Sequence, residues 1–169
     1  MPSIHREICE ICLKSDVLCP ACEEKVKNGI ISALDIEVAR ILEKLKEKFK
    51  VLKSAEIIKV VGSENYVIIL ARKGDVSKII GKNGSIVRAL SKELGKQVKV
   101  VEYSEDMKTF INNLLFPANV ETISIVYKRD GNKVLKIVVS SKSTKKIDEE
   151  LIKQVVHSLF NYDTEVVMV

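Results

Sequence analysis

The feature that most constrains this fold is a helical pattern that two glycines interrupt. The stretch SKIIGKNGSIVRAL, residues 77–90, has apolar residues at helical spacing on both sides of Gly81 and Gly84. Each glycine inside a helix costs about 1 kcal/mol relative to alanine. The pattern therefore predicts two short helices joined by the loop Gly-Lys-Asn-Gly.

The residues around this loop predict the rest of a small α+β unit. Two β-rich runs, at 56–61 and 66–72, are separated by Gly-Ser-Glu-Asn and indicate a hairpin. Ser32 and Asp35 have the spacing of a capping box, and they predict a helix over about 32–50. A third strand is expected at 97–103. Residues 30–104 thus predict the order α-β-β-α-α-β.

Residues 105–169 predict the same order again. A helix is expected to stop before Pro117, and a hairpin turns at Asp130 and Gly131. A further helix is expected at 148–160 and a final strand at 164–169. The sequence therefore predicts an α+β chain with three parts, at residues 1–29, 30–104 and 105–169.

The first part contains every cysteine of the chain, in two Cys-x-x-Cys pairs: Cys9, Cys12, Cys19 and Cys22. Two such pairs supply four thiolates, the ligand set that holds one structural Zn²⁺ in a tetrahedron. We interpret this part as a zinc knuckle similar to a zinc ribbon. Residues 1–22 have little core to bury, so we expect the part to be unfolded without the metal. Disulfides, an iron–sulfur cluster and a redox dithiol remain alternatives.

Charge is distributed unevenly along the chain. Residues 1–50 hold nine basic and nine acidic side chains, and residues 105–169 also hold nine of each. Residues 51–104 hold ten basic and five acidic side chains, so this segment carries the whole net charge of +5. An excess of positive charge around the glycine loop indicates an anionic partner there.

The loop itself has the chemistry of a phosphate-binding turn. The N-terminus of the second helix offers N–H donors and a positive dipole end, and glycines let a phosphodiester backbone approach closely. We expect Lys78, Lys82 and Arg88 to attract phosphates, and Ile79, Ile80 and Ile86 to form the floor of a groove for bases. This combination suits single-stranded RNA.

In its context the loop resembles the Gly-x-x-Gly loop of KH domains, here in the type II arrangement. The stretches GKNGSIVRALSKELGKQVKVVEYSED and FINNLLFPANV further resemble archaeal NusA-like proteins, which are small tandem KH proteins. The resemblance covers roughly residues 30–169. It implies a cytoplasmic RNA-binding protein that acts in transcription elongation and termination. Its RNA clamp corresponds to Gly81, Lys82, Asn83 and Gly84.

Two departures from that family stand out. In the second copy the loop position holds KSTKKIDEE, without a Gly-x-x-Gly, and Glu149 and Glu150 put negative charge at the new helix start. We interpret residues 105–169 as a degenerate KH domain, with a residual chance of phosphate contact at Lys142, Lys145 and Lys146. The four-cysteine part is the second departure, and it suggests a paralogue with a different role.

No catalytic constellation is visible in the sequence. The two histidines are His5, interpreted as a surface residue, and His157, interpreted as packing beside Val156. We expect no enzyme activity, small-molecule substrate or membrane span. The main hypothesis is an RNA-binding regulator. The alternative is an adaptor that scaffolds RNA polymerase or ribosomal components, with RNA contact incidental.

Overall fold

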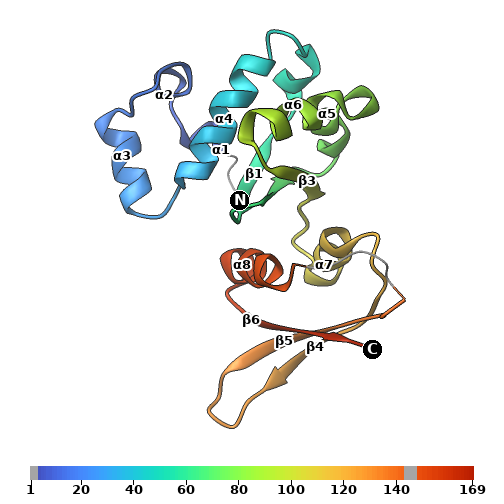
Figure 1. Ribbon diagram of the computed structural model, residues 1–169. Helices are drawn as coiled ribbons and strands as arrows, with labels where there is room; N and C mark the ends of the chain where they lie inside the picture. Colours follow the sequence, from blue (N-terminus) through green and yellow to red (C-terminus); the bar gives the residue numbers. More distant parts are fainter. Residues whose placement is uncertain (1–3, 143–147) are drawn as a thin grey trace. The chain divides into compact units, whose positions relative to one another are not determined.

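The computed structural model describes residues 4–142 and 148–169, which form two compact units. The first unit spans residues 1–103 and the second spans residues 104–169. Among the described residues the strands form two three-stranded sheets, one in each unit (Figure 1).

The sheet of the first unit has the strand order β1-β2-β3. Strands β1 (Ile57–Gly62) and β2 (Tyr66–Ala71) form the predicted antiparallel hairpin. Strand β3 (Gln97–Glu102) pairs parallel to β2. A parallel neighbour requires a crossover connection, and the two helices around the glycine loop provide it.

The predicted capping box begins helix α4 (Ala33–Leu45). The Asp35 N–H donates to Ser32 Oγ at 3.0 Å, and the Ser32 N–H donates to Asp35 Oδ2 at 2.9 Å. The helix ends at Leu45, earlier than the predicted residue 50. The chain turns there and continues into the 3-10 helix η1 (Lys50–Ser54), which buries Leu52 in the core. Burial of an apolar side chain thus outweighs the helical propensity of the Glu- and Lys-rich run.

Helices α5 (Val76–Ile80) and α6 (Ser85–Leu94) flank the 3-10 turn η2 (Lys82–Gly84), as the interrupted pattern predicted. Helix α4 contacts β1 and α6, and helices α5 and α6 both contact β3. The core between helices and sheet contains side chains from every one of these helices and from the sheet, including Val38, Ala39, Leu42, Val67, Ile69, Ile79, Ile86 and Leu90.

The cysteine part consists of helices in the residues that the structure describes: α1 (Ile4–Glu7), α2 (Glu10–Lys14) and α3 (Pro20–Lys27). The expected ribbon, which would be built from strands, is therefore wrong. Each Cys-x-x-Cys pair begins a helix, because Cys9 and Cys19 are N-cap residues and Pro20 occupies the first turn of α3.

The cysteine part also shares the core of the first unit. Ile4, Ile8 and Leu13 are buried in the same apolar cluster as the side chains of α4. The expectation that residues 1–22 bury little apolar surface is therefore wrong. Helices α1 and α2 both contact α4, and α1 also contacts β1. The cysteines are thus attached to the hydrophobic core of the unit, in which Cys12 and Cys22 are buried.

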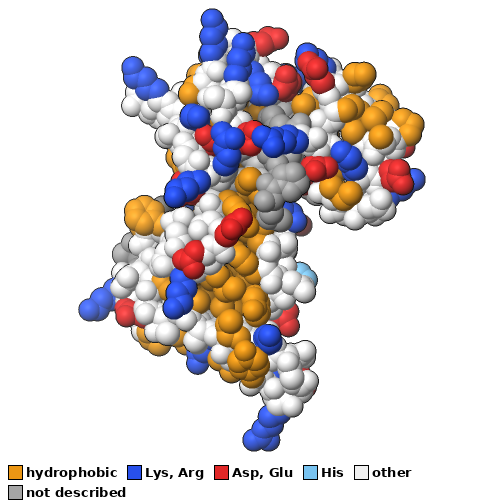
Figure 2. All heavy atoms as spheres, turned by 180° about the vertical axis from the view of Figure 1, so that it is seen from behind, with side chains coloured by type: hydrophobic (Ala, Val, Ile, Leu, Met, Phe, Trp, Pro, Cys, Tyr) orange, Lys and Arg blue, Asp and Glu red, His pale blue; other side chains and the backbone are white. Residues whose placement is uncertain are grey.

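The second unit repeats the strand order and pairing of the first. Its elements are α7 (Met107–Leu115), β4 (Val120–Tyr127), β5 (Lys133–Val139), α8 (Glu149–Phe160) and β6 (Asp163–Met168). The predicted hairpin pairs β4 antiparallel to β5, and β6 lies parallel to β5. Figure 2 shows apolar side chains at the surface of this unit, where the edge strand β4 exposes Ile125, Val126 and Tyr127.

The helices of both units are short. Helix α4 has 13 residues and α8 has 12, whereas a helix that spans a bilayer needs about 20. Within the part of the chain that the structure describes, every helix lacks the length and apolar character that crossing a membrane requires.

Candidate nucleic-acid interface and metal centre

The loop between α5 and α6 is a tight turn with three residues at positive φ. These are Gly81 (φ 78°, ψ 171°), Asn83 (φ 55°, ψ 26°) and Gly84 (φ 73°, ψ 18°). The Gly84 N–H donates to the Gly81 carbonyl at 3.1 Å and closes the turn. The loop therefore folds back at once into α6, instead of extending as a flexible linker.

Gly81 is required here for two separate reasons. Its φ and ψ lie in a region that residues with a Cβ atom almost never adopt. A Cβ atom at this position would also lie 2.6 Å from Ile86 Cγ1, which is inside van der Waals contact. The loop backbone thus lies directly on the side chain of Ile86.

The apolar residues beside the loop do not form the predicted floor. Ile79 and Ile86 are 0% and 1% exposed, so both belong to the core and cannot meet a base directly. Ile80 is half-buried and keeps some exposed surface. Ile86 lies directly under Gly81 and supports the loop, whereas Ile79 packs in the core of the unit.

The predicted cations do lie around the loop, in different environments. Lys82 and Asn83 are exposed at the tip, and Arg88 is exposed on α6. Lys78 is half-buried, and its Nζ forms an ion pair with Asp75 Oδ1 at 3.1 Å. Lys82 and Arg88 are in no ion pair with any described residue, so they are the cations most available to a bound anion.

The N-terminus of α6 is open towards this loop. Its N-cap residue is Gly84, and none of the described side chains accepts a hydrogen bond at this cap. The positive end of the helix dipole and the first N–H groups therefore face the exposed tip that carries Lys82. A phosphate group placed there would gain both interactions.

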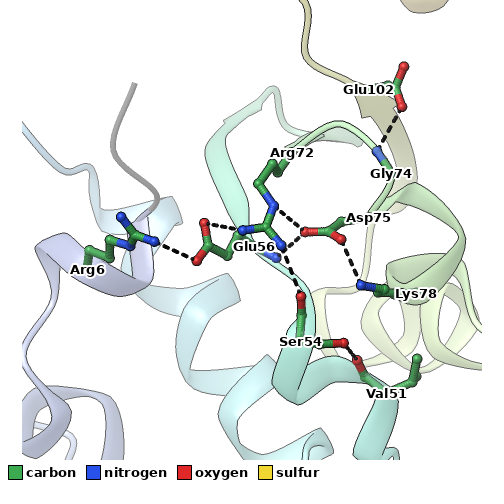
Figure 3. Close-up of polar contacts among 9 residues, drawn as sticks. All are labelled: Arg6, Val51, Ser54, Glu56, Arg72, Gly74, Asp75, Lys78 and Glu102. Carbon is green, nitrogen blue, oxygen red and sulfur yellow. Dashed lines mark hydrogen bonds and ion pairs between the residues drawn. The ribbon is translucent and has the colours of Figure 1, made fainter.

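A buried carboxylate holds the start of α5 in place (Figure 3). Asp75 is 2% exposed and accepts a hydrogen bond from the Glu56 N–H at 2.9 Å. Arg72 Nε lies 3.0 Å from the same carboxylate, whose other oxygen pairs with Lys78. Burial alone would raise the pKa of Asp75, but the Glu56 N–H and these two cations lower it below its ordinary value.

This network extends into the cysteine part of the unit (Figure 3). Glu56 accepts from Arg72 and from Arg6 of α1, each at 3.1 Å. At the other side of the turn the Gly74 N–H donates to Glu102 Oε1 at 3.0 Å. Side chains from α1, the hairpin and β3 thus fix the segment that leads into α5.

The four cysteines meet at one point of the first unit. Their Sγ atoms all lie within 4.8 Å of one another, and Cys9 Sγ is 3.8 Å from Cys19 Sγ. Zinc–sulfur bonds of about 2.3 Å in a tetrahedron place the sulfurs about 3.8 Å apart. Cys12 and Cys22 are buried, while Cys9 and Cys19 are nearer to solvent. The geometry therefore fits one tetrahedral metal ion.

The chemistry of the four thiols also fits a metal. All four are free in the structure, and 3.8 Å is far longer than a disulfide bond of about 2.05 Å. The Cys22 N–H and the neighbouring thiols lower the pKa of Cys19 to about 7. The Cys19 N–H lowers the pKa of Cys12, but the surrounding thiols and burial raise it to about 12. The four thiols thus favour the loss of one proton, from Cys19, and oppose the loss of a proton from Cys12. A bound cation would stabilise the additional thiolates.

Arg40 connects helix α4 to this centre, a contact that no local sequence pattern indicates. Its Nε donates to the Cys12 carbonyl at 3.0 Å across 28 residues of sequence. Its Nη2 is buried without a hydrogen-bond partner among the described residues. Arg40 is half-buried, and its positive charge would complement the negative charge that four thiolates give to this centre.

The equivalent position in the second unit is different. Helix α8 is capped by Asp148, which accepts from the Leu151 N–H at 3.1 Å, and Glu149 and Glu150 are exposed in its first turn. The prediction for Lys145 and Lys146 lies outside the described residues, and Lys142 is exposed.

Neither histidine is among the residues of the two candidate sites. His157 is exposed on α8, so its interpretation as a packing residue is wrong. The interpretation of His5 as a surface residue concerns a side chain that lies outside the described part of the structure.

Comparisons with known proteins agree with this geometry. Residues 25–103 match the NusA-like first KH domain. The chain is 31% identical over 84 residues to the probable transcription termination protein NusA of Methanococcus vannielii, which is 50% of this chain and 47% of that protein. It is 30% identical over 90 residues to the protein of the same name from Methanocaldococcus jannaschii. This match covers 53% of this chain and 48% of that protein. The chain thus spans about half the length of these relatives.

A solved structure extends the similarity beyond the first unit. The crystal structure of APE1850 superposes with a TM-score of 0.60 at 25% identity, over 77% of this chain and 96% of that chain. This is more of the chain than the first unit contains, so the match includes residues of both units. Residues 25–103 therefore match a NusA-like first KH domain, and the chain is similar to the NusA proteins of archaea.

Proposed function

We propose that this protein is an RNA-binding regulatory factor that holds single-stranded RNA at the Gly81–Gly84 loop. The observation that carries the proposal is the loop itself: an exposed lysine at the open N-terminus of α6, inside a NusA-like first KH domain. KH domains use a loop of this type to clamp about four nucleotides.

Each residue has a specific role in this proposal. Gly81 and Gly84 let the phosphodiester backbone approach the N–H groups of the turn. Lys82 and Arg88 attract phosphates, and Asn83 donates from its amide at the tip. Lys78 contributes less because Asp75 already neutralises it. Ile80 is the apolar residue beside the loop that can contact a base.

The regulatory setting follows from the relatives. Two of them carry the name probable transcription termination protein NusA. We infer a role in transcription elongation and termination, with RNA polymerase or a ribosomal component as a further partner. The second unit serves in this proposal as a degenerate KH domain that contributes to packing or to partner contact, because acidic groups surround the start of α8.

The metal in this proposal is one structural Zn²⁺ bound by Cys9, Cys12, Cys19 and Cys22. Four thiolates leave no open coordination position for substrate. An iron–sulfur cluster would need its cysteines farther apart than the 4.8 Å observed, since several metal atoms separate them. Bound zinc would hold the starts of α2 and α3 together. Metal analysis of the purified protein should give one zinc and no stoichiometric iron.

Binding of a single-stranded RNA oligonucleotide, followed by fluorescence anisotropy, tests the clamp. We expect the association constant to fall with salt, with a logarithmic slope of about −2 if about three phosphates are neutralised. The double variant Lys82→Asp/Asn83→Asp should bind about ten- to a hundredfold more weakly, because it places two carboxylates where phosphates lie. Its melting temperature should not change, because both positions are exposed.

A matched control carries the same charge change elsewhere. The variant Lys27→Asp/Asn28→Asp alters an exposed Lys-Asn pair at the end of α3 and should keep wild-type RNA affinity. Equal affinities for the loop variant and the wild type, with an unchanged circular dichroism spectrum, would show that the loop is not the clamp. The adaptor function would then be favoured, and binding insensitive to salt would support it.

A further inference from the structure

The cysteine part exposes large apolar side chains directly beside the metal ligands. Ile11, between Cys9 and Cys12, is 77% exposed, and Val17, two residues before Cys19, is 73% exposed. Pro20 and Ala21, between the second pair of cysteines, are exposed as well. We call Ile11, Val17, Pro20 and Ala21 the knuckle surface. Figure 2 shows apolar side chains gathered over this part of the first unit.

The knuckle surface is not needed for the fold of the first unit. Helix α2 buries Cys12 and Leu13, so the side that carries Ile11 is left to solvent. The ligands on both sides of Ile11 would hold its backbone rigid once metal is bound. A rigid exposed apolar group loses little entropy on association, and its burial in an interface removes apolar surface from water.

Within the sequence that carries the knuckle surface, residues 9–24, the charges are mostly negative. Residues 9–24 carry four acidic side chains and one basic side chain: Glu10, Asp16, Glu23, Glu24 and Lys14. Lys14 is already paired with Glu10 at 2.8 Å. Four thiolates with one divalent cation add a further charge of −2. RNA phosphates would be repelled here, and a second copy of the chain would bring two acidic rims together.

We propose that the knuckle surface is a docking site for another protein, one that offers an apolar recess rimmed by Lys and Arg. Ile11 and Val17 would fill the recess, and the acidic rim would pair with the basic residues around it. This goes beyond RNA binding, and it uses the opposite sign of charge from the Gly81–Gly84 loop. One unit would thereby contact RNA and a protein at separate places.

Site-specific photocrosslinking tests this proposal on the full-length, metal-loaded protein. Benzoylphenylalanine is placed at position 11, 17 or 51 and photolysed in extract of the source organism. Val51 is the control, since it is 46% exposed in η1, outside the cysteine part. We expect positions 11 and 17, but not 51, to crosslink one protein, and the crosslinked peptide to lie beside Lys and Arg residues.

The purified partner then provides the quantitative test. We expect Ile11→Asp to weaken its binding at least tenfold and Asp16→Asn to weaken it several-fold at low salt, while Val51→Asp and RNA affinity show no change. Crosslinks to nucleic acid or between two copies would overturn the proposal. A partner whose crosslinked surface is acidic would also overturn the proposal. So would crosslinking at positions 11 and 17 that is no stronger than at position 51.

Discussion

Gly81 shows how a single residue sets the geometry of the loop. The substitution Gly81→Ala adds a Cβ atom 2.6 Å from Ile86 Cγ1 and forces φ of 78° on a residue that avoids it. We expect a loss of roughly 1–3 kcal/mol in the free energy of unfolding from the backbone alone, and more from the contact. Urea unfolding followed by circular dichroism measures this loss.

The matched control for this variant is Gly95→Ala at the other end of α6. Gly95 also has positive φ, at 65°, but a Cβ atom added there would meet nothing within 4 Å. The control should therefore cost only the backbone strain. If Gly81→Ala destabilises the protein no more than Gly95→Ala does, the contact with Ile86 does not exclude a Cβ atom at position 81.

Arg40 is a second residue whose role depends on its neighbours. We expect Arg40→Gln to weaken metal binding about tenfold, because it removes both the hydrogen bond to Cys12 and a cation beside the thiolates. Arg40→Lys should recover part of the affinity, since it keeps the charge. Competition with a zinc chelator measures the affinity. The control is Lys44→Gln on the exposed side of α4, and an equal loss in both variants would exclude a specific role for Arg40.

At the scale of elements, the short helices of the cysteine part depend on two sources of stability. A bound metal would hold the starts of α2 and α3 together, while Ile4, Ile8 and Leu13 pack against the core of the unit. Helices of four to eight residues are not stable in isolation. We therefore expect the proposed metal and the core to act together in keeping these helices folded.

Removal of the metal by a chelator should thus loosen α1, α2 and α3 without unfolding the sheet. Hydrogen exchange measured by mass spectrometry should become faster in residues 4–27 and stay slow in β2 and β3, whose pairing is independent of the cysteines. A chelated protein with unchanged exchange in residues 4–27 would show that the metal contributes no stability there.

At the scale of the whole molecule, the two units share a strand order but differ at the helix that follows the hairpin. Helix α6 begins at an uncapped glycine, whereas α8 begins at Asp148 with two further carboxylates. We expect the fragment 1–103 to bind single-stranded RNA at least tenfold more tightly than the fragment 104–169 at the same salt concentration. Circular dichroism of each fragment checks that it is folded, and equal affinities of two folded fragments would contradict the expectation.

Features that depend on neighbours within a few residues could be predicted from the sequence alone. The break between α5 and α6, the capping box of Ser32 and Asp35, and the turn at Gly131 all come from backbone preferences and local hydrogen bonds. Such signals depend on residues within one helical turn or one hairpin turn, so they can be recognised without the rest of the chain. The positions of the loop cations could be predicted for the same reason.

The packing of helices on the sheet sets which of these residues reach solvent and which distant groups they contact. Ile79, Ile80 and Ile86 are equally apolar, yet the packing of α5 and α6 on the sheet buries two of them and leaves Ile80 partly exposed. Asp35 caps α4 and also accepts from the Val60 N–H at 2.8 Å, and Arg40 reaches Cys12. These contacts join residues that are 25 and 28 positions apart. Burial and long-range pairing depend on how helices and strands pack together, which no local pattern specifies.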